Sequence, residues 1–360
     1  MEPFHLFLLA VGILNFAGGV LSVASWGFVR RKYEKTPDGR KDYRVSVIVP
    51  SRGEIDVKAM ENQDYEDYEI IVVVDEEEEK REVERRTGEK TRVIISEKYP
   101  SCSGKNSALL TGIKHASGDV FLFADDDILP HEKWISHMVS SMDEVSTTYR
   151  WYFSPPMLCV WNAAIAAVMF YPRFNFAWGG STAIKREVFE KYDIESIWKR
   201  ELVDDLTLTR VMKENGVKIK FVPQAMVESM PEENIFSWMN REFAWLRYYF
   251  PSLWAIALFF NAGMRISNIA GAIYMFIDPL VGTLLLSSLL FDFVRGWQEY
   301  ATYVHLMEYP KERFLHPLYH FFLRPVASFI IFYNMISSAF IRKINWKGRE
   351  YSIQEAFRQT

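Results

Sequence analysis

The chain has 360 residues, of which 49% are hydrophobic, 16% aromatic and 24% charged, and its 42 basic side chains nearly balance the 46 acidic ones. This length allows one large or two small domains, and the composition excludes a wholly disordered chain and a polybasic nucleic-acid binder, so no nucleic-acid partner is expected. Two cysteines, Cys102 and Cys159, are too few for a disulfide scaffold and have no zinc-type spacing to the histidines.

A stretch without charged residues runs from Phe4 to Val29. As a helix it would be about 39 Å long, enough to cross a hydrocarbon core of roughly 30 Å. A cleavable signal peptide carries positive charge in front of its apolar run, whereas here the basic residues 30, 31, 32 and 35 follow it. We therefore expect a transmembrane helix within residues 1–35 and a cytoplasmic chain after it. A buried core helix is the alternative.

Residues 44–250 alternate short apolar runs with helical stretches, which predicts a cytoplasmic α/β domain. The predicted strands are Val45–Val49, Ile70–Val74, Val93–Ile95 and Val120–Phe123, and the predicted helices are Ser107–Ala116 and His131–Ser141. Nearly continuous apolar strands are typical of a sheet buried on both faces. This rhythm favours a mostly parallel sheet covered by helices, with ligands at the carboxyl ends of the strands.

Polar residues follow three of these strands directly. They lie in the run from Pro50 to Glu54 (PSRGE) after the first strand, at Asp75 after the second, and at Asp125, Asp126 and Asp127 after the fourth. Three adjacent carboxylates repel one another unless a positive group is bound, and Mg²⁺ or Mn²⁺ is commonly held by one or two carboxylates plus substrate phosphates. The pattern therefore predicts a metal site at Asp125 and Asp127. A helix N-terminal cap is the alternative for Asp127.

Two further polar groups stand at predicted helix starts. The segment from Glu201 to Leu206 opens a helix that Gly216 should close, and its acidic pair, Asp204 and Asp205, would taken alone usually be a cap. Lys105 follows a loop and precedes a helix, where its ammonium and the first amides could hold phosphate. The glycine spacing of a nucleotide-triphosphatase phosphate loop is missing in front of it.

The segment Met157–Phe170 is apolar but too short to cross a bilayer alone. We interpret it as a lipid-facing or acceptor-facing helix beside the membrane, and a buried core helix is the alternative.

The C-terminal part of the chain is apolar again. Ile266–Phe291 and Pro317–Ile341 are long enough to span, and Ser252–Ala262 suits a helix at the membrane surface. The predicted organisation is a membrane helix in 1–35, a cytoplasmic domain in 44–250, an interfacial helix and two membrane helices in 251–345, and a cytoplasmic tail in 346–360. Asp278 and Arg324 lie inside the predicted spans, where they either contact a polar part of a substrate or snorkel to the interface beside a proline kink.

Several motifs occur in the order seen in family 2-like inverting glycosyltransferases of the GT-A fold. They are VSVIVPSRGE ending at Glu54, VVVD ending at Asp75, the Gly104–Lys105 loop, ADDD at 124–127, GGSTAIKREVF at 179–189 and DDLTL at 204–208. With the segment 148–152 and the expected membrane helices, the chain most resembles the ceramide glucosyltransferase group, family 21. One motif departs: the (Q/R)xxRW signature reads Arg241 to Trp245 here, with Ala244 in place of Arg and Arg247 nearby.

The resemblance implies a role for each matching residue. Pro50, Ser51, Glu54, Asp75, Lys105, Asp125 and Asp126 would bind the nucleotide sugar, and Asp125 and Asp127 would hold Mn²⁺ or Mg²⁺. Asp205 would be the catalytic base. The donor-sugar and acceptor side would be formed by Trp151, Gly179, Gly180, Asp204, Arg241 and Trp245.

The resemblance also implies a function at the cytoplasmic face of the membrane. A hexose, with UDP-glucose as the expected donor, would move to the hydroxyl of a membrane lipid and give a β-glycolipid. A polyprenyl-phosphate sugar synthase is the nearest rival, because it also joins a GT-A domain to membrane spans. Its acceptor is already an anion and needs no base, so an essential Asp205 would argue against it. Two lower-ranked rivals are a processive polysaccharide synthase and a non-catalytic sensor with the same fold.

Overall fold

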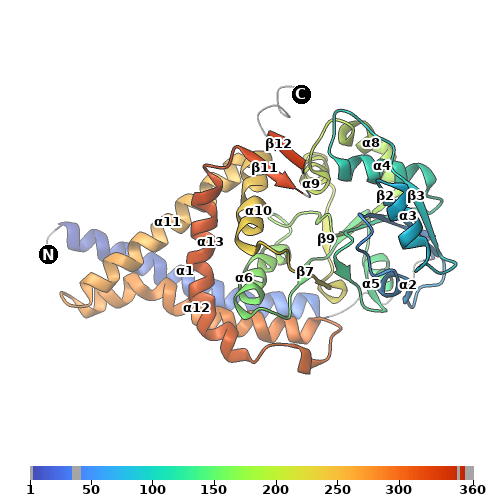
Figure 1. Ribbon diagram of the computed structural model, residues 1–360. Coiled ribbons are helices and arrows are strands. Elements are labelled where there is room, and N and C mark those ends of the chain that lie inside the picture. Colours follow the sequence, from blue (N-terminus) through green and yellow to red (C-terminus); the bar gives the residue numbers. More distant parts are fainter. Residues whose placement is uncertain (1–2, 35–41, 347–348, 353–360) are drawn as a thin grey trace. The chain divides into compact units, whose positions relative to one another are not determined.

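The computed structural model describes residues 3–34, 42–346 and 349–352 (Figure 1). The chain forms two compact units. The helical unit consists of Met1–Lys35, Phe153–Ala167 and Glu232–Arg342, and the α/β unit of Thr36–Tyr152, Val168–Pro231 and Lys343–Thr360. The structure therefore draws the division differently from the predicted 44–250 domain, since residues 153–167 and 232–250 belong to the helical unit.

A mixed sheet forms the centre of the α/β unit. Within the described residues its seven strands have the order β3-β2-β1-β4-β8-β6-β9. The strands are β1 (Val45–Pro50), β2 (Tyr68–Val74), β3 (Thr91–Ile95), β4 (Val120–Ala124), β6 (Val145–Thr147), β8 (Ser181–Lys185) and β9 (Ile219–Phe221). The four predicted strands are thus confirmed, and they pair in parallel. Strand β8 runs antiparallel to both β4 and β6, which makes the sheet mixed.

Helices and short strands complete the α/β unit. The helices are α2 (Val57–Glu61), α3 (Glu77–Glu84), α4 (Gly104–His115), α5 (Trp134–Ser140), α7 (Arg186–Lys191), α8 (Ile194–Trp198) and α9 (Asp204–Glu214). The short strands β5 (Ile128–Leu129), β10 (Val227–Ser229) and β7 (Arg150–Trp151) pair in that order. A hairpin of β11 (Lys343–Trp346) and β12 (Arg349–Ser352) follows the helical unit in the chain. Of the predicted tail, residues 347–348 and 353–360 lie outside the described residues.

The apolar strands bury their side chains against the covering helices. Helix α4 packs on β1 and β2, and Gly112 lets it come so close that an added Cβ would lie 2.4 Å from a methyl group of Ile48. On the same core, Trp198 lies edge-on to Phe123 and Phe189, with ring centroids 5.1 and 5.5 Å apart. Such pairs add about 0.5–1.5 kcal/mol each beyond the burial of apolar area. This packing fixes the starts of α4 and α9 relative to the end of β4.

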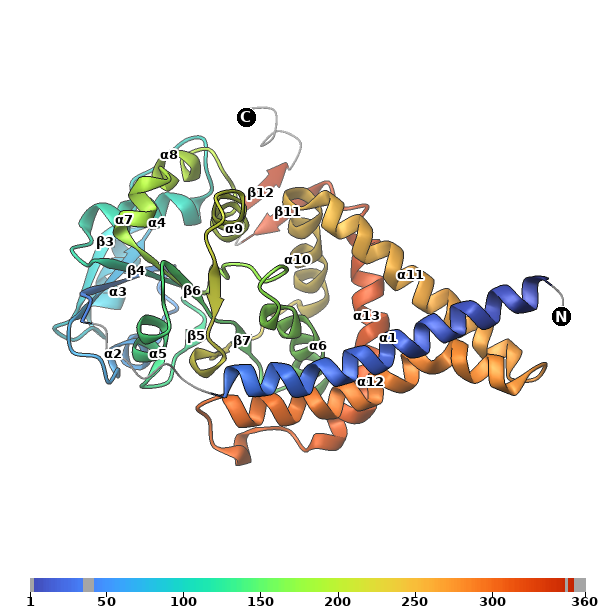
Figure 2. The same ribbon diagram turned by 180° about the vertical axis from the view of Figure 1, so that it is seen from behind.

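The described part of the helical unit contains a short 3-10 helix (Lys311–Arg313) and six α-helices: α1 (Pro3–Tyr33), α6 (Pro156–Ala166), α10 (Ile235–Tyr249), α11 (Pro251–Tyr274), α12 (Pro279–Leu306) and α13 (Pro317–Ser338). In the described ranges, α1, α11, α12 and α13 are long and apolar enough to cross a membrane. Helix α1 runs beside α12 in both views (Figure 1, Figure 2). Asn15 ties α1 to α11 by donating a hydrogen bond to Ser267 Oγ at 2.6 Å.

The predicted continuous span Ile266–Phe291 is wrong, because the chain leaves the helix after Tyr274 and starts α12 at Pro279. Asp278 causes the new start: its Oδ1 accepts hydrogen bonds from the amides of Leu280 and Val281, and proline suits the first position of a helix. Residues 252–262, predicted as a separate interfacial helix, form the first half of the continuous helix α11.

The two ionisable groups predicted inside spans have local partners. Asp278 caps α12 and lies 3.3 Å from His5 Nε2. Arg324 is buried and donates two hydrogen bonds from Nε to Glu299, at 2.9 and 3.1 Å. The sequence interpretation considered substrate contact and snorkelling, and missed these partners because they lie on other helices.

The predicted lipid-facing helix at Met157–Phe170 is mostly buried, so the alternative interpretation, a core helix, is the one observed. Helix α6 packs on α12 and α13. Trp161 Nε1 donates to Asn334 Oδ1 at 3.1 Å, and the Tyr303 hydroxyl donates to the carbonyl of Ala163 at 2.9 Å.

Close contact between α1 and α12 depends on a glycine. A Cβ on Gly12 would lie 2.7 Å from Leu284 Cβ and 3.2 Å from the Leu284 carbonyl carbon. We expect Gly12→Leu to separate the two helices and to lower the free energy of unfolding by about 1–3 kcal/mol, the usual cost of overpacking. Thermal unfolding in detergent would measure the loss.

Gly18 on the same helix is the matched control, since no atom of the described chain lies within 4 Å of a Cβ built there. Gly18→Leu should leave the melting temperature unchanged. Equal melting temperatures for the two variants would contradict the packing described here.

Candidate functional site

Three strand ends meet at one edge of the sheet. Strands β2, β1 and β4 are neighbours and parallel, so the residues after them lie side by side. The amide of Ser51 donates to the carbonyl of Val73 at 2.8 Å. The amide of Arg52 donates to Asp126 Oδ2 at 3.3 Å, and its guanidinium lies 3.9 Å from Asp75 Oδ2. The structure thus brings Ser51, Asp75 and Asp126, one predicted residue from each of the three strand ends, to the same edge of the sheet.

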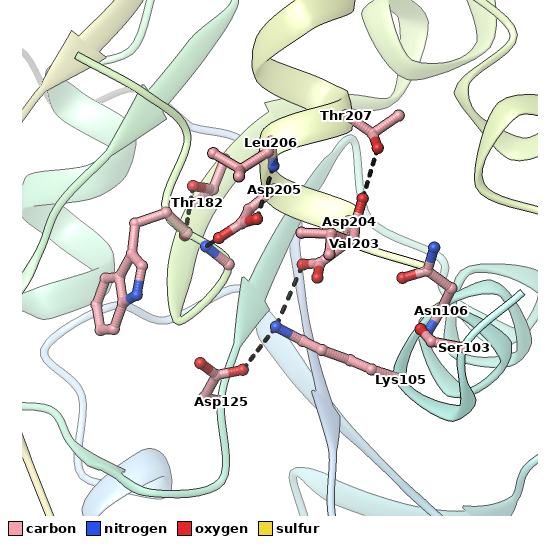
Figure 3. A network of polar contacts seen from close by, with 12 residues as sticks. Ser103, Lys105, Asn106, Asp125, Thr182, Val203, Asp204, Asp205, Leu206 and Thr207 are labelled. Carbon is pink, nitrogen blue, oxygen red and sulfur yellow. Dashed lines mark hydrogen bonds and ion pairs between the residues drawn. The ribbon is translucent and has the colours of Figure 1, made fainter. Parts of the chain in front are cut away.

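Lys105 joins the end of β4 to the start of α9 (Figure 3). Its Nζ lies 2.8 Å from Asp125 Oδ1 and 3.3 Å from Asp204 Oδ2. Lys105 stands in the first turn of α4, which Ser103 caps by accepting a hydrogen bond from the amide of Asn106. Two acidic groups far apart in the sequence therefore converge on one ammonium.

Negative charges outnumber positive charges in this cluster. Burial alone would lower the pKa of Lys105, but the carboxylates of Asp125, Asp204 and Asp205 more than offset this effect, so its pKa lies well above the usual value. Burial raises the pKa of Asp204, and the ammonium of Lys105 opposes that rise. Three carboxylates around one ammonium leave an excess of negative charge, which favours the binding of a further cation.

Asp205 is held by two backbone amides. Gly179 N donates to its Oδ2 at 3.1 Å, and Leu206 N donates to its Oδ1 at 2.6 Å (Figure 3). The carboxylate is half-buried at the N-terminus of α9, where the helix dipole favours negative charge. The predicted helix is confirmed: α9 starts at Asp204, within the predicted opening segment, and Gly216 follows its end with a positive φ of 71°.

Gly179 leaves room for the ion pair. A Cβ at this position would lie 2.7 Å from both Lys105 Nζ and Asp204 Oδ2. Gly180 is crowded in another way, because a Cβ there would lie 2.1 Å from the ring of Trp178. Both predicted glycines are thus required by close packing, and Gly179 belongs to the cluster itself.

Residues missed by the sequence analysis position the cluster. Asn106 Nδ2 donates to the carbonyls of Glu201 and Trp198, at 2.8 and 3.2 Å, and so ties α4 to the loop before α9. Trp198 Nε1 in turn donates to the carbonyl of Asp204 at 3.1 Å. The position of Asn106 directly after Lys105 was the only available signal, since its partners lie more than ninety positions away.

Asp127 lies against β10. Its Oδ2 accepts a hydrogen bond from Ser229 Oγ at 3.2 Å, and its carbonyl accepts one from the amide of Met230 at 3.0 Å. Beside it, burial raises the pKa of Tyr152 to about 12, so this phenol stays neutral at physiological pH. Ser229 was not predicted, because nothing in the sequence pairs it with a residue a hundred positions earlier.

The remaining predicted residues have varied surroundings. Pro50 ends β1 and Glu54 is exposed, whereas Asp126 is buried and Trp151 is buried on β7. Arg241 and Trp245 stand on α10 in the helical unit, where Arg241 pairs with Glu232 at 2.5 Å. The predicted roles of these residues in binding donor or acceptor stay predictions.

The donor set suits a cation that draws most of its ligands from a substrate. No group of three or more His, Cys, Asp or Glu side chains in the described ranges is arranged to hold a metal ion. Mg²⁺ and Mn²⁺ need only one or two carboxylates when diphosphate oxygens supply further ligands. Asp125 and Asp127, with the surplus of negative charge around Lys105, fit that need.

Comparison with known proteins gives one family match. The model described as glycosyl transferase family 21 matches residues 13–358. No curated protein matches significantly.

Three solved structures are similar at low identity. Mannosyltransferase PcManGT from Pyrobaculum calidifontis, in complex with GDP-Man and Mn²⁺, is 16% identical over 92% of this chain and 97% of that one, with a TM-score of 0.48. GalNAc-T7 with UDP, GalNAc and Mn²⁺ is 13% identical over 58% of this chain and 49% of that one, with a TM-score of 0.39. S. aureus TarS 1–349 is 14% identical over 86% of this chain and 96% of that one, with a TM-score of 0.38.

Removing the ammonium should destabilise the α/β unit. Lys105→Met leaves Asp204 buried without its opposing charge, and such a loss costs about 3–5 kcal/mol. In the variant, the pKa of Asp204 is raised further above its usual 3.8, so the native state binds more protons than the unfolded state. Stability should therefore fall as the pH rises above that usual value, more steeply than in the wild type, and denaturant titrations at several pH values would measure the slope.

Lys114→Met is the control on the same helix, because Lys114 forms an exposed ion pair with Glu97. An exposed pair of this kind contributes at most about 1 kcal/mol. If both variants lost the same small amount of stability, Lys105 would not neutralise the acidic cluster.

Proposed function

Because the chain belongs to glycosyltransferase family 21, it is a glycosyltransferase, and we propose that it moves a hexose from a nucleotide sugar to the hydroxyl of a membrane lipid. The observation that carries the proposal is the convergence of Asp125 and Asp204 on Lys105. It supports one site formed from the strand end that would hold the donor and the helix start that carries Asp205. UDP-glucose is the donor that the family favours.

Different residues of the site would bind different parts of the donor. Ser51 and Asp75, at the ends of β1 and β2, would contact the base and ribose, with Pro50 and Glu54 beside them. The ammonium of Lys105 would exchange part of its pairing with the carboxylates for an ion pair with the diphosphate, which carries more negative charge. A divalent cation held by Asp125 and Asp127, when bound, supplies positive charge at the departing diphosphate.

Asp205 would act as the general base. The amides of Gly179 and Leu206 fix its carboxylate in place, so that it can accept the proton of an acceptor hydroxyl. Attack by that hydroxyl opposite to the leaving group is a single in-line displacement. An α-linked donor would therefore give a β-glycoside.

The membrane helices support a lipid acceptor and a cytoplasmic site. The last turn of α1 contains three basic residues, Arg30, Arg31 and Lys32, and positive charge beside a membrane helix favours the cytoplasmic side. The chain leaves the α/β unit at Pro231 and returns to it at Lys343, so an even number of crossings must lie between. We infer that α11 and α12 cross as a hairpin. Helix α13 packs on α12 and also on the short helices α6 and α10, and we infer that it does not cross, which replaces the predicted span Pro317–Ile341. This keeps the expected count of three spans.

One experiment tests donor, acceptor and product together. The purified chain in lipid nanodiscs is incubated with labelled sugar nucleotides and Mn²⁺, and the products are identified by mass. We expect a hexosyl lipid from UDP-glucose, and none after the metal is chelated. A polyprenyl-phosphate sugar or a polymer as the product would overturn the proposal in favour of its rivals.

The role of Asp205 has a sharper test. Asp205→Asn keeps the size of the side chain but removes the base, so the transfer rate should fall about 10²–10⁴-fold while nucleotide-sugar binding persists. Glu214→Gln, an exposed change at the end of the same helix, should leave the rate unchanged. Full activity of Asp205→Asn would instead favour an acceptor that is already an anion.

A further inference from the structure

A buried cluster of charged side chains lies among α11, α12 and α13. Its members among the described residues are Arg265, Asp292, Arg295, Glu299 and Arg324. Only 1% of Asp292 and of Glu299 is exposed, with 5% of Arg265 and 7% of Arg324, while Arg295 is half-buried. Burying so many charges among long apolar helices costs free energy unless every charge is paired.

Two of the three arginines are paired. Arg324 donates to both oxygens of Glu299, and its Nη1 lies 3.6 Å from Asp292 Oδ1. Arg295 Nη2 lies 3.3 Å from the same oxygen of Asp292. Gly296 allows α13 to come this close, because a Cβ there would lie 2.2 Å from the carbonyl oxygen of His320.

Arg265 is the third arginine of the cluster. Within the described residues, its Nε and Nη1 find no hydrogen-bond partner, and neither does Asp292 Oδ2. The guanidinium lies over the ring of Phe329, 4.7 Å from its centroid. Three guanidinium groups face two carboxylates, so the described cluster carries one positive charge too many. A buried, unsatisfied guanidinium calls for an anion with several acceptor oxygens.

The depth of the cluster suggests the source of that anion. Asp292 and Glu299 stand 13 and 20 residues after the start of α12, which is about 20 and 30 Å along the helix. Arg265 stands 9 residues before the end of α11, about 14 Å from the turn that joins the two helices. In a hydrocarbon core of about 30 Å, the cluster reaches from mid-depth to the interface opposite that turn. Lipid phosphates lie at that interface.

We propose that an anionic phospholipid places its phosphate below that interface, between α11 and α12, where Arg295 binds it from the interface side and Arg265 from the deeper side. Phosphate oxygens accept from the free N–H groups of Arg265, and the half-exposed Arg295 gives the headgroup its entry. A headgroup hydroxyl, as in phosphatidylglycerol, donates to Asp292 Oδ2. This lipid stabilises the helical unit and is distinct from the lipid that accepts the sugar.

Native mass spectrometry of the full chain in detergent tests the site. Phosphatidylglycerol should be retained at one molecule per chain, whereas diacylglycerol with the same acyl chains, which lacks the phosphate, should not. Arg265→Gln should weaken retention about tenfold or more, the loss expected for hydrogen bonds to a charged group. Arg31→Gln, an exposed change on α1, should not alter it and controls for general attraction to anionic lipid.

Melting temperatures distinguish a lipid from a free anion and from an empty site. Phosphatidylglycerol should raise the melting temperature of the wild type and of Arg31→Gln but not of Arg265→Gln, and inorganic phosphate alone should have no effect. An equal rise with inorganic phosphate would assign the site to a free anion and overturn the lipid. If Arg265→Gln is more stable without lipid and retains lipid like the wild type, Arg265 is merely an unpaired buried charge and the proposal fails. Arg265→Lys, which keeps the charge, replaces the Gln variant if that does not fold.

Discussion

The ion pairs of Lys105 with Asp125 and Asp204 are the constraint on which the α/β unit depends. Each partner comes from a different element: the start of α4, the end of β4 and the start of α9. Because Asp204 is buried and Lys105 and Asp125 are half-buried, a displacement of one element would leave a charge without its counterpart. The surrounding hydrogen bonds of Asn106 and Trp198 hold the three elements in that arrangement. The site is therefore built into the packing of the unit.

Both units solve the same electrostatic problem in different ways. In the α/β unit, carboxylates outnumber the ammonium, and the surplus negative charge suits a cation and a substrate that arrives with its own phosphates. In the buried cluster of the helical unit, three guanidinium groups face two carboxylates, and the surplus suits an anion. In each case the imbalance, rather than the pairing, points to a ligand.

The sequence predicted most of the parallel half of the sheet, since runs such as Val120–Phe123 are apolar on both faces and leave little alternative. It did not predict β6, β8 and β9, which are short and contain polar residues such as Ser146, Thr182 and Lys220. The strand-end acids and Asp205 could be found from position and resemblance. Asn106 and Ser229 could not, because their partners are distant in sequence. The break at Asp278 was missed because apolar residues continue on both sides of it.

Residues 153–167, which include α6, belong to the helical unit, although the residues before and after them belong to the α/β unit. This arrangement limits which fragments of the protein can be prepared. A fragment that omits the terminal membrane helices still contains α6, whose side chains, including Trp161, pack on α12 and α13. Those apolar surfaces would then face water, and the fragment would associate through them. The α/β unit is thus not continuous in the sequence, and removing the long apolar helices would expose the surfaces of α6 that they cover.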